Sequence, residues 1–232
     1  MSAQSVVLVH GAWGGGWCWE RTVPHLATAD RMVLAPTLLG LGDTAGQATP
    51  EIGLADHVAQ VTEAAQSLDG AVTLVGHSYG GMVVAAVAAQ LPDQVAKIVY
   101  LDAFVPTAGQ SAYDILPWLG EACDAARLAD RPWLIEPFDV AGLGVEDPHD
   151  QAAIQPRMTP MLRKAFTDKS SVDARSGSVP VSFIRCARQE FFAEMASEVQ
   201  KLHWQVVDID AAHMAPLTAP EALASTLIGL LG

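Results

Sequence analysis

The sequence predicts an α/β fold, in which a mostly parallel six-stranded sheet is covered by helices on both faces. Two observations support this fold class. Short apolar, β-branched runs alternate with helix-compatible stretches along most of the chain, and such alternation is typical of parallel sheets. The chain has 232 residues, half of them hydrophobic, which suffices for one substantial core but is short for two. We therefore expect a single domain over residues 1–232.

The individual elements follow from periodicity and turn signals. Continuous apolar runs predict buried strands at 6–10, 31–35, 72–75, 97–101, 181–185 and 204–209. Helices are expected between them, at 17–27, 54–68, 79–89, 190–202 and 220–231. In the second of these helices, Leu54, Val58, Val61 and Ala65 recur at helical spacing, which indicates a helix that packs on the sheet.

The alternation is interrupted once, between Phe104 and Arg175. Prolines are frequent in this interval and prevent long helices or strands. They are at positions 106, 117, 132, 137, 148, 156 and 160. We interpret residues 111–161 as a small helical cap over the carboxyl edge of the sheet, where ligands bind in open α/β folds. Its aromatic residues Trp118, Trp133 and Phe138 either line a pocket or attach the cap to the core.

Composition excludes several classes of partner. The net charge is -13 and the isoelectric point is near 4.7, so nucleic acids and anionic membranes would repel the protein. No apolar run is long enough to span a membrane, and we expect no signal peptide before the first predicted strand. The three cysteines have no paired or metal-type spacing, which favours reduced thiols and a cytoplasmic location. We expect a small-molecule substrate; the oligomeric state stays open.

Ser78 lies within the sequence Gly76-His-Ser-Tyr-Gly80, directly after an apolar β-branched run and before an alanine-rich helical stretch. This pattern is typical of a nucleophile elbow, in which a strained strand-to-helix turn exposes the serine hydroxyl. Small residues on both sides of the turn allow that conformation. We therefore predict that Ser78 is a catalytic nucleophile.

A glycine-rich turn follows the first predicted strand, at residues 11–17. In hydrolases with a nucleophile elbow, one backbone N–H of the oxyanion hole comes from such a loop and the other from the residue after the serine. These positions correspond to Ala12 and Tyr79. His10 precedes the turn, and we interpret it as a structural hydrogen-bonding residue.

His213 follows the last predicted strand in the sequence Asp210-Ala-Ala-His-Met214. The order serine, acid, histidine is the one that hydrolases with this elbow use, so we predict that His213 is the general base. His77 is expected to pack within the elbow. The remaining histidines, for which solvent exposure or core hydrogen bonds are the better explanation, are His25, His57, His149 and His203.

Together these motifs, with Tyr100-Leu-Asp-Ala-Phe-Val-Pro106, resemble the α/β-hydrolase fold family. Within it, the chain is similar to the branch of plant methylesterases, hydroxynitrile lyases and small bacterial carboxylesterases, pyrethroid hydrolases among them. The resemblance implies a two-part cap, no cofactor and no metal, and an acyl-serine cycle. By the same resemblance a lyase has threonine at position 11 and lysine at 214. This chain has Gly11 and Met214, which disfavours cyanohydrin chemistry.

One position departs from the family pattern. The resemblance places the acid of the catalytic triad after the strand at 181–185, where this chain has Gln189, and an amide cannot stabilise an imidazolium as a carboxylate does. Two substitutes are available. Glu190 is the next residue, and Asp102 ends the preceding strand four residues before Pro106, an arrangement that resembles a subgroup of haloalkane dehalogenases. We favour Asp102 over Glu190.

Two classes of function remain open. The first is a serine esterase that cleaves a small, largely apolar carboxylic ester or related acyl compound through an acyl-serine intermediate. The alternative is a ligand-binding or non-hydrolytic tailoring protein on the same scaffold. Ser78 and His213 favour the hydrolase, whereas Gln189 favours the alternative.

Overall fold

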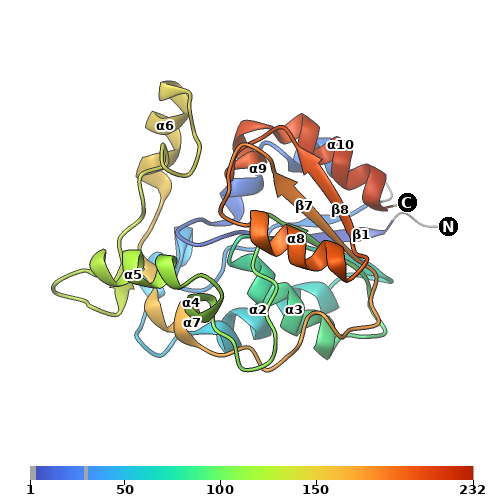
Figure 1. Cartoon of the computed structure of the whole chain (residues 1–232), viewed down its shortest axis with the longest axis horizontal. Helices are drawn as coiled ribbons and strands as arrows, with labels where there is room; N and C mark the ends of the chain where they lie inside the picture. The colour runs from blue at the N-terminus through green and yellow to red at the C-terminus, as the bar shows by residue number, and fades with distance from the viewer. Residues whose placement is uncertain (1–3, 29–30, 232) are drawn as a thin grey trace.

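The computed structural model describes residues 4–28 and 31–231; residues 1–3 and 232, the ends of the predicted domain, lie outside the described residues. A six-stranded sheet forms the centre of the molecule (Figure 1). Every strand pair in it is parallel, and the strand order is β2-β1-β3-β4-β7-β8. The strands are β1 (Ser5–Val9), β2 (Val33–Leu34), β3 (Val72–His77), β4 (Val95–Leu101), β7 (Val181–Cys186) and β8 (Gln205–Ile209). The predicted fold class is thereby confirmed.

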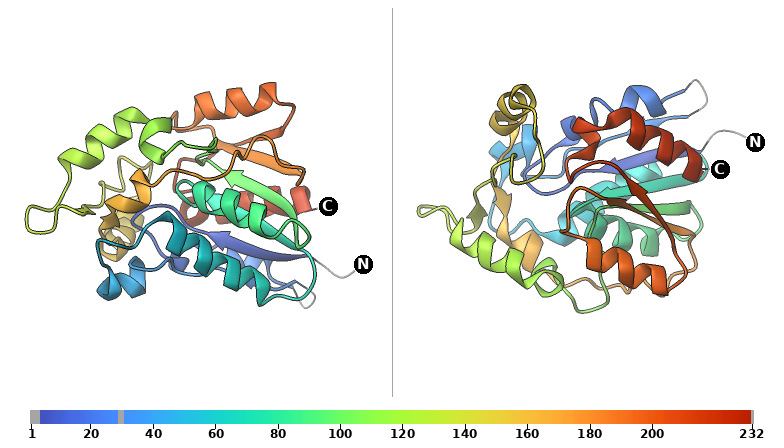
Figure 2. Two further views of the ribbon diagram at one scale, coloured as in Figure 1. Left: turned by 90° about the horizontal axis from the view of Figure 1, so that it is seen from below. Right: turned by 45° about the horizontal axis from the view of Figure 1, so that its top comes forward.

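The two faces of the sheet bury alternate side chains of each strand. In β1, Val7 and Val9 belong to a core that includes residues of α2 (Leu54–Gln66), α3 (Gly80–Gln90) and α8 (Ala193–Lys201). Val6 and Leu8 belong to a second core on the other face. The elements packed there are η1 (Gly16–Trp19), α1 (Val23–Leu26), α9 (Ala215–Thr218) and α10 (Pro220–Leu231). Figure 2 shows α2 and α3 over the sheet from below and α10 over it when the top is turned forward.

The helix expected at 17–27 is broken into η1 and α1. The break has a simple cause in Pro24, which lies in the first turn of α1 and has no N–H with which to continue a helix from the preceding turn. The other predicted helices agree with α2, α3, α8 and α10 to within a few residues.

A long insertion separates β4 from β7 and lies at the end of the molecule opposite the two termini (Figure 1). It contains a two-stranded antiparallel sheet and several short helices. Its elements are α4 (Ala112–Ile115), α5 (Pro117–Ala125), β5 (Leu134–Ile135), α6 (Pro148–Ile154), η3 (Gln155–Arg157), β6 (Met161–Leu162) and α7 (Arg163–Thr167). Another short helix, η2 (Gly42–Gln47), follows β2.

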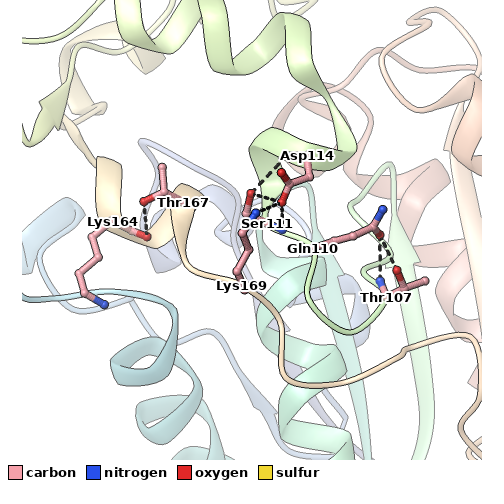
Figure 3. A network of polar contacts seen from close by, with 7 residues as sticks. All are labelled: Thr107, Gln110, Ser111, Asp114, Lys164, Thr167 and Lys169. Carbon is pink, nitrogen blue, oxygen red and sulfur yellow. Dashed lines mark hydrogen bonds and ion pairs between the residues drawn. The ribbon is translucent and has the colours of Figure 1, made fainter.

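The start and the end of the insertion are tied together. Gly109 N–H donates to Ser170 O, and Ser170 N–H donates to Gln110 O, both at 2.8 Å. Asp114 accepts hydrogen bonds from the Ser111 N–H and hydroxyl at 2.7 Å and forms an ion pair with Lys169 (Figure 3). The chain therefore leaves the sheet and returns to it at one place. The cap boundaries of about 111 and 161 stay a prediction.

Candidate active site

Ser78 lies in the turn between β3 and α3 with a positive φ of 52°. Its glycine neighbours have no room for a side chain. A methyl group on Gly76 would stand 2.7 Å from Gly80 O, and one on Gly80 would stand 2.5 Å from Val9 O. The strained serine is held by hydrogen bonds from its N–H to Leu101 O and from Phe104 N–H to its carbonyl, both at 3.2 Å. This is the strand-turn-helix geometry that the elbow motif requires.

The glycine-rich loop after β1 passes directly beside Ser78. A methyl group on Gly11 would stand 2.9 Å from the Ser78 Cβ, so this loop approaches the serine as closely as only glycine allows. Ala12 lines the same cavity as Ser78. Among the described residues, no protein acceptor pairs with the backbone N–H of Ala12 or of Tyr79. Within the described residues, these two donors are therefore not engaged by a backbone carbonyl.

His213 and Asp102 are in direct contact. Nδ1 of His213 donates a hydrogen bond of 2.7 Å to Oδ2 of Asp102, and both side chains are buried. Since a carboxylate only accepts, the proton is on Nδ1 and Nε2 of the neutral ring is left as an acceptor. The second carboxylate oxygen of Asp102 accepts from Cys186 N–H at 3.3 Å. Asp102 has a positive φ of 43° directly after β4, and His213 follows β8, so both lie at the carboxyl edge of the sheet.

The other candidate acid, Glu190, is exposed. It lines a polar groove together with Glu194, Glu198 and Arg175. The preceding Gln189 points its amide at the insertion, where Nε2 donates to Gly142 O at 3.1 Å. Of the two carboxylates that the sequence offered, the structure therefore brings Asp102 to His213.

The sequence predicted only that His77 packs within the elbow, but in the structure His77 also supports the loop of His213. Its Nε2 donates to the backbone carbonyl of His213 at 2.8 Å, and the two rings are 4.6 Å apart. Burial lowers the pKa of His77 well below its usual value, so the ring is neutral. The rings of Phe191 and Phe192 lie 5.5 and 5.8 Å from His213. His213 is thus held by its backbone, by Asp102 and by two aromatic side chains.

The remaining histidines are structural or exposed. His10 is fully buried: Nε2 accepts from Leu38 N–H at 2.9 Å and Nδ1 donates to Gly11 O at 2.7 Å. Burial lowers the pKa of His10 to about 4. His57 accepts from the Tyr79 hydroxyl and donates to Leu39 O, each at 2.9 Å. The exposed histidines are His25, His149 and His203.

A cavity of about 320 Å³ contains Ser78 and His213 in its wall. Most of the wall is apolar and aromatic, and its aromatic residues are Trp13, Phe104, Trp118, Phe138, Phe166, Phe191 and Phe192. The insertion supplies several of these. Trp118 lines the cavity while 46% exposed, and Phe138 lines it while its ring lies 4.5 Å from that of Trp13. Trp133 is outside this cavity and packs against the core. Trp118 therefore lines the pocket, Trp133 attaches the cap to the core, and Phe138 does both.

Within residues 4–28 and 31–231, no cluster of three or more His, Cys, Asp or Glu side chains is arranged to hold a metal ion. Cys18, Cys123 and Cys186 are buried free thiols. No helix in this part of the chain is long and apolar enough to cross a membrane.

Comparison with known proteins places the chain in a family. The model of the alpha/beta hydrolase family matches residues 6–226, and the chain belongs to this family. Salicylic acid-binding protein 2 of Nicotiana tabacum is 29% identical over 251 residues, which cover 96% of this chain and 95% of that protein. A carbendazim hydrolyzing esterase of Nocardioides sp. is 46% identical over 113 residues. That match spans about half of each protein, 48% of this chain and 46% of the relative.

Solved structures agree with the fold. An extracellular α/β-hydrolase from a Paenibacillus species superposes with a TM-score of 0.84 at 21% identity, over 97% of this chain and 98% of the other. At this identity the likeness establishes the fold alone. Further relatives are plant methylesterases, and further similar structures include a pyrethroid hydrolase. The branch of the family that the sequence motifs indicated is therefore confirmed.

Proposed function

We propose that the protein is a serine esterase that cleaves a small, largely apolar carboxylic ester or a related acyl compound. The observation that carries this proposal is that Ser78 and His213 line one apolar cavity, with Asp102 hydrogen-bonded to Nδ1 of His213. Relatives named as esterases support the same reaction class.

In the proposed cycle, Ser78 Oγ attacks the ester carbonyl carbon while His213 Nε2 accepts its proton. The carboxylate of Asp102 stabilises the resulting imidazolium. The N–H groups of Ala12 and Tyr79 donate to the developing oxyanion. His213 then returns the proton to the departing alkoxide, which leaves an acyl group on Ser78.

Water then attacks the acyl carbon while His213 Nε2 takes its proton. The bond between the acyl carbon and Ser78 Oγ breaks, His213 returns the proton to Ser78 Oγ, and the carboxylic acid product is released. The aromatic wall of the cavity favours an apolar substrate, because the burial of apolar surface provides the binding free energy.

The alternative of a binding protein rested on Gln189. Because Asp102 supplies a carboxylate to His213, Gln189 no longer favours a non-hydrolytic protein.

The two functions are separated by a fluorophosphonate probe, which becomes covalently attached to an activated serine. We expect stoichiometric labelling that maps to Ser78, none in Ser78→Ala, and normal labelling when the exposed Ser67 is replaced by alanine. A folded protein that binds apolar ligands but is not labelled would contradict the proposal.

A further inference from the structure

The turn after β7 is rigidly joined to the loop that carries His213. Ala187 N–H donates to Ile209 O at 2.9 Å, and Arg188 N–H donates to Ala211 O at 3.0 Å. Gln189 N–H closes the turn on Cys186 O at 3.1 Å. The side chain of Gln189 therefore starts from a backbone whose position relative to His213 is set by hydrogen bonds.

The side chain of Gln189 reaches a loop of the insertion, residues 139–145, that forms part of the cavity wall. Its amide donates to Gly142 O, and both Gly142 and Leu143 line the cavity. The loop is internally ordered, since Gly144 N–H donates to Ala141 O and Val145 N–H donates to Val140 O, each at 3.0 Å. A displacement at Gly142 is therefore expected to move the wall as a unit.

A second contact joins the same two regions. Gly144 has a φ of 86°, and a methyl group on it would stand 2.3 Å from the Ala212 Cβ and 3.0 Å from Gln189 Oε1. Ala212 is the residue before His213. The 139–145 loop thus packs on the histidine loop so closely that only glycine fits at position 144.

We propose that Gln189 and Gly144 are positioning residues that hold the 139–145 wall of the cavity against the loop of His213. Residue 189, where the family resemblance places the triad acid, here orients the substrate wall, and the acid is supplied from the turn after β4. The kinetic consequences of this inference rest on the proposed function. The contacts themselves can be tested by hydrogen exchange, which does not require ester turnover.

The first test replaces the hydrogen-bond donor. Gln189→Met keeps a side chain of similar length but cannot donate to Gly142 O. We expect the KM ratio of 4-nitrophenyl octanoate to 4-nitrophenyl acetate to rise about fivefold, because the larger acyl group needs more of the wall. Gln189→Lys, which can donate to the same carbonyl, is expected to restore most of the ratio. The control Gln200→Met, on the exposed side of α8, is expected to leave it unchanged.

The second test adds a methyl group at the close contact. Gly144→Ala is expected to lower kcat for both esters about tenfold or more, because the methyl group displaces Ala212 and with it His213. The matched control is Gly70→Ala, since Gly70 has a similar φ of 77° but nothing within 4 Å of an added methyl group. Gly70→Ala carries the same backbone strain and should lower the melting temperature without changing kcat.

Hydrogen exchange separates this inference from the proposed function. The amides of Gly144 and Val145 should lose protection about tenfold in Gln189→Met and keep it in Gln200→Met, whether or not the protein turns over an ester. If the wild-type protein hydrolyses no ester and Gln189→Met still loses this protection, the esterase proposal is refuted and the positioning role is retained. Unchanged protection, or a KM ratio equal in the two methionine variants, would overturn the positioning role.

Discussion

The carboxyl edge of the sheet and the insertion contribute to the candidate active site in different ways. The edge supplies Ser78 and Asp102 in strained turns with positive φ, and a dense set of backbone hydrogen bonds surrounds them. The insertion supplies apolar surface, including a Trp118 that is nearly half exposed. Reacting groups need narrowly defined geometry, whereas an apolar wall needs only area and shape. Substitutions at the edge should therefore alter kcat or stability strongly, and substitutions of the aromatic residues with which the insertion lines the cavity should alter KM modestly.

The largest effect is expected at the acid. Asp102→Asn should lower kcat by three to four orders of magnitude, by analogy with the amide substitution in a serine-protease triad, because an amide cannot stabilise the imidazolium of His213. Steady-state kinetics on a 4-nitrophenyl ester measure this loss. Glu190→Gln is the control and should retain nearly all activity; the reverse ranking would assign the acid to Glu190.

A second large effect concerns stability at the sheet edge. Burial lowers the pKa of His10 to about 4, from its ordinary 6.5. As the pH falls below 6.5 the unfolded state takes up a proton that the folded state does not accept until about pH 4. Stability is therefore lost across this interval and is fully present above it, with a contribution on the order of 3 kcal/mol. Urea unfolding at pH 7 and pH 4.5 measures the difference.

His10→Gln keeps an acceptor for the Leu38 N–H but has no ring that can be protonated. The free energy of unfolding of this variant should therefore depend less steeply on pH than that of the wild type. Part of the dependence should remain, since burial also lowers the pKa of His57 and of His77. The exposed His25 provides the control. If His10→Gln and His25→Gln have the same pH dependence as the wild type, the burial of a neutral His10 does not govern stability.

A smaller effect is expected when a carboxylate is placed at position 189, in the turn after β7. This substitution tests whether a side chain at that position can reach His213. In the Asp102→Asn background, Gln189→Asp should recover about tenfold in kcat, because the backbone of that turn is hydrogen-bonded to the His213 loop and a carboxylate there can stabilise the imidazolium. Gln189→Asn in the same background controls for shape without charge. Equal rates in these two folded double variants would show that position 189 no longer reaches His213.

The smallest effects are expected in the insertion. Trp118→Ala should raise KM about three- to tenfold with little change in kcat, because the ring contributes apolar wall to the cavity. Trp133→Ala should leave KM unchanged and lower the free energy of unfolding by about 1–2 kcal/mol, since the half-buried ring packs outside the cavity. Equal effects of both substitutions on KM would show that Trp118 and Trp133 do not differ in their contribution to substrate binding.

The sequence by itself determined the sheet, its helices and the places of Ser78 and His213. Such information is local: apolar runs show where strands are buried, and the glycines around Ser78 mark a turn in which the backbone of the same chain approaches too closely for a side chain. The sequence also narrowed the acid to two carboxylates. It did not determine that Pro24 would split a helix into η1 and α1, because either outcome is compatible with the apolar pattern of that stretch.

Only the tertiary structure decided which carboxylate meets His213. Asp102 and His213 are 111 residues apart in the chain, and their contact depends on β4 and β8 lying on either side of β7, which no local pattern encodes. The same holds for Gln189, whose partner Gly142 is in the insertion, and for the different roles of Trp118 and Trp133. Local periodicity defines elements, whereas the direction of a side chain across a cavity is set by the packing of segments distant in sequence.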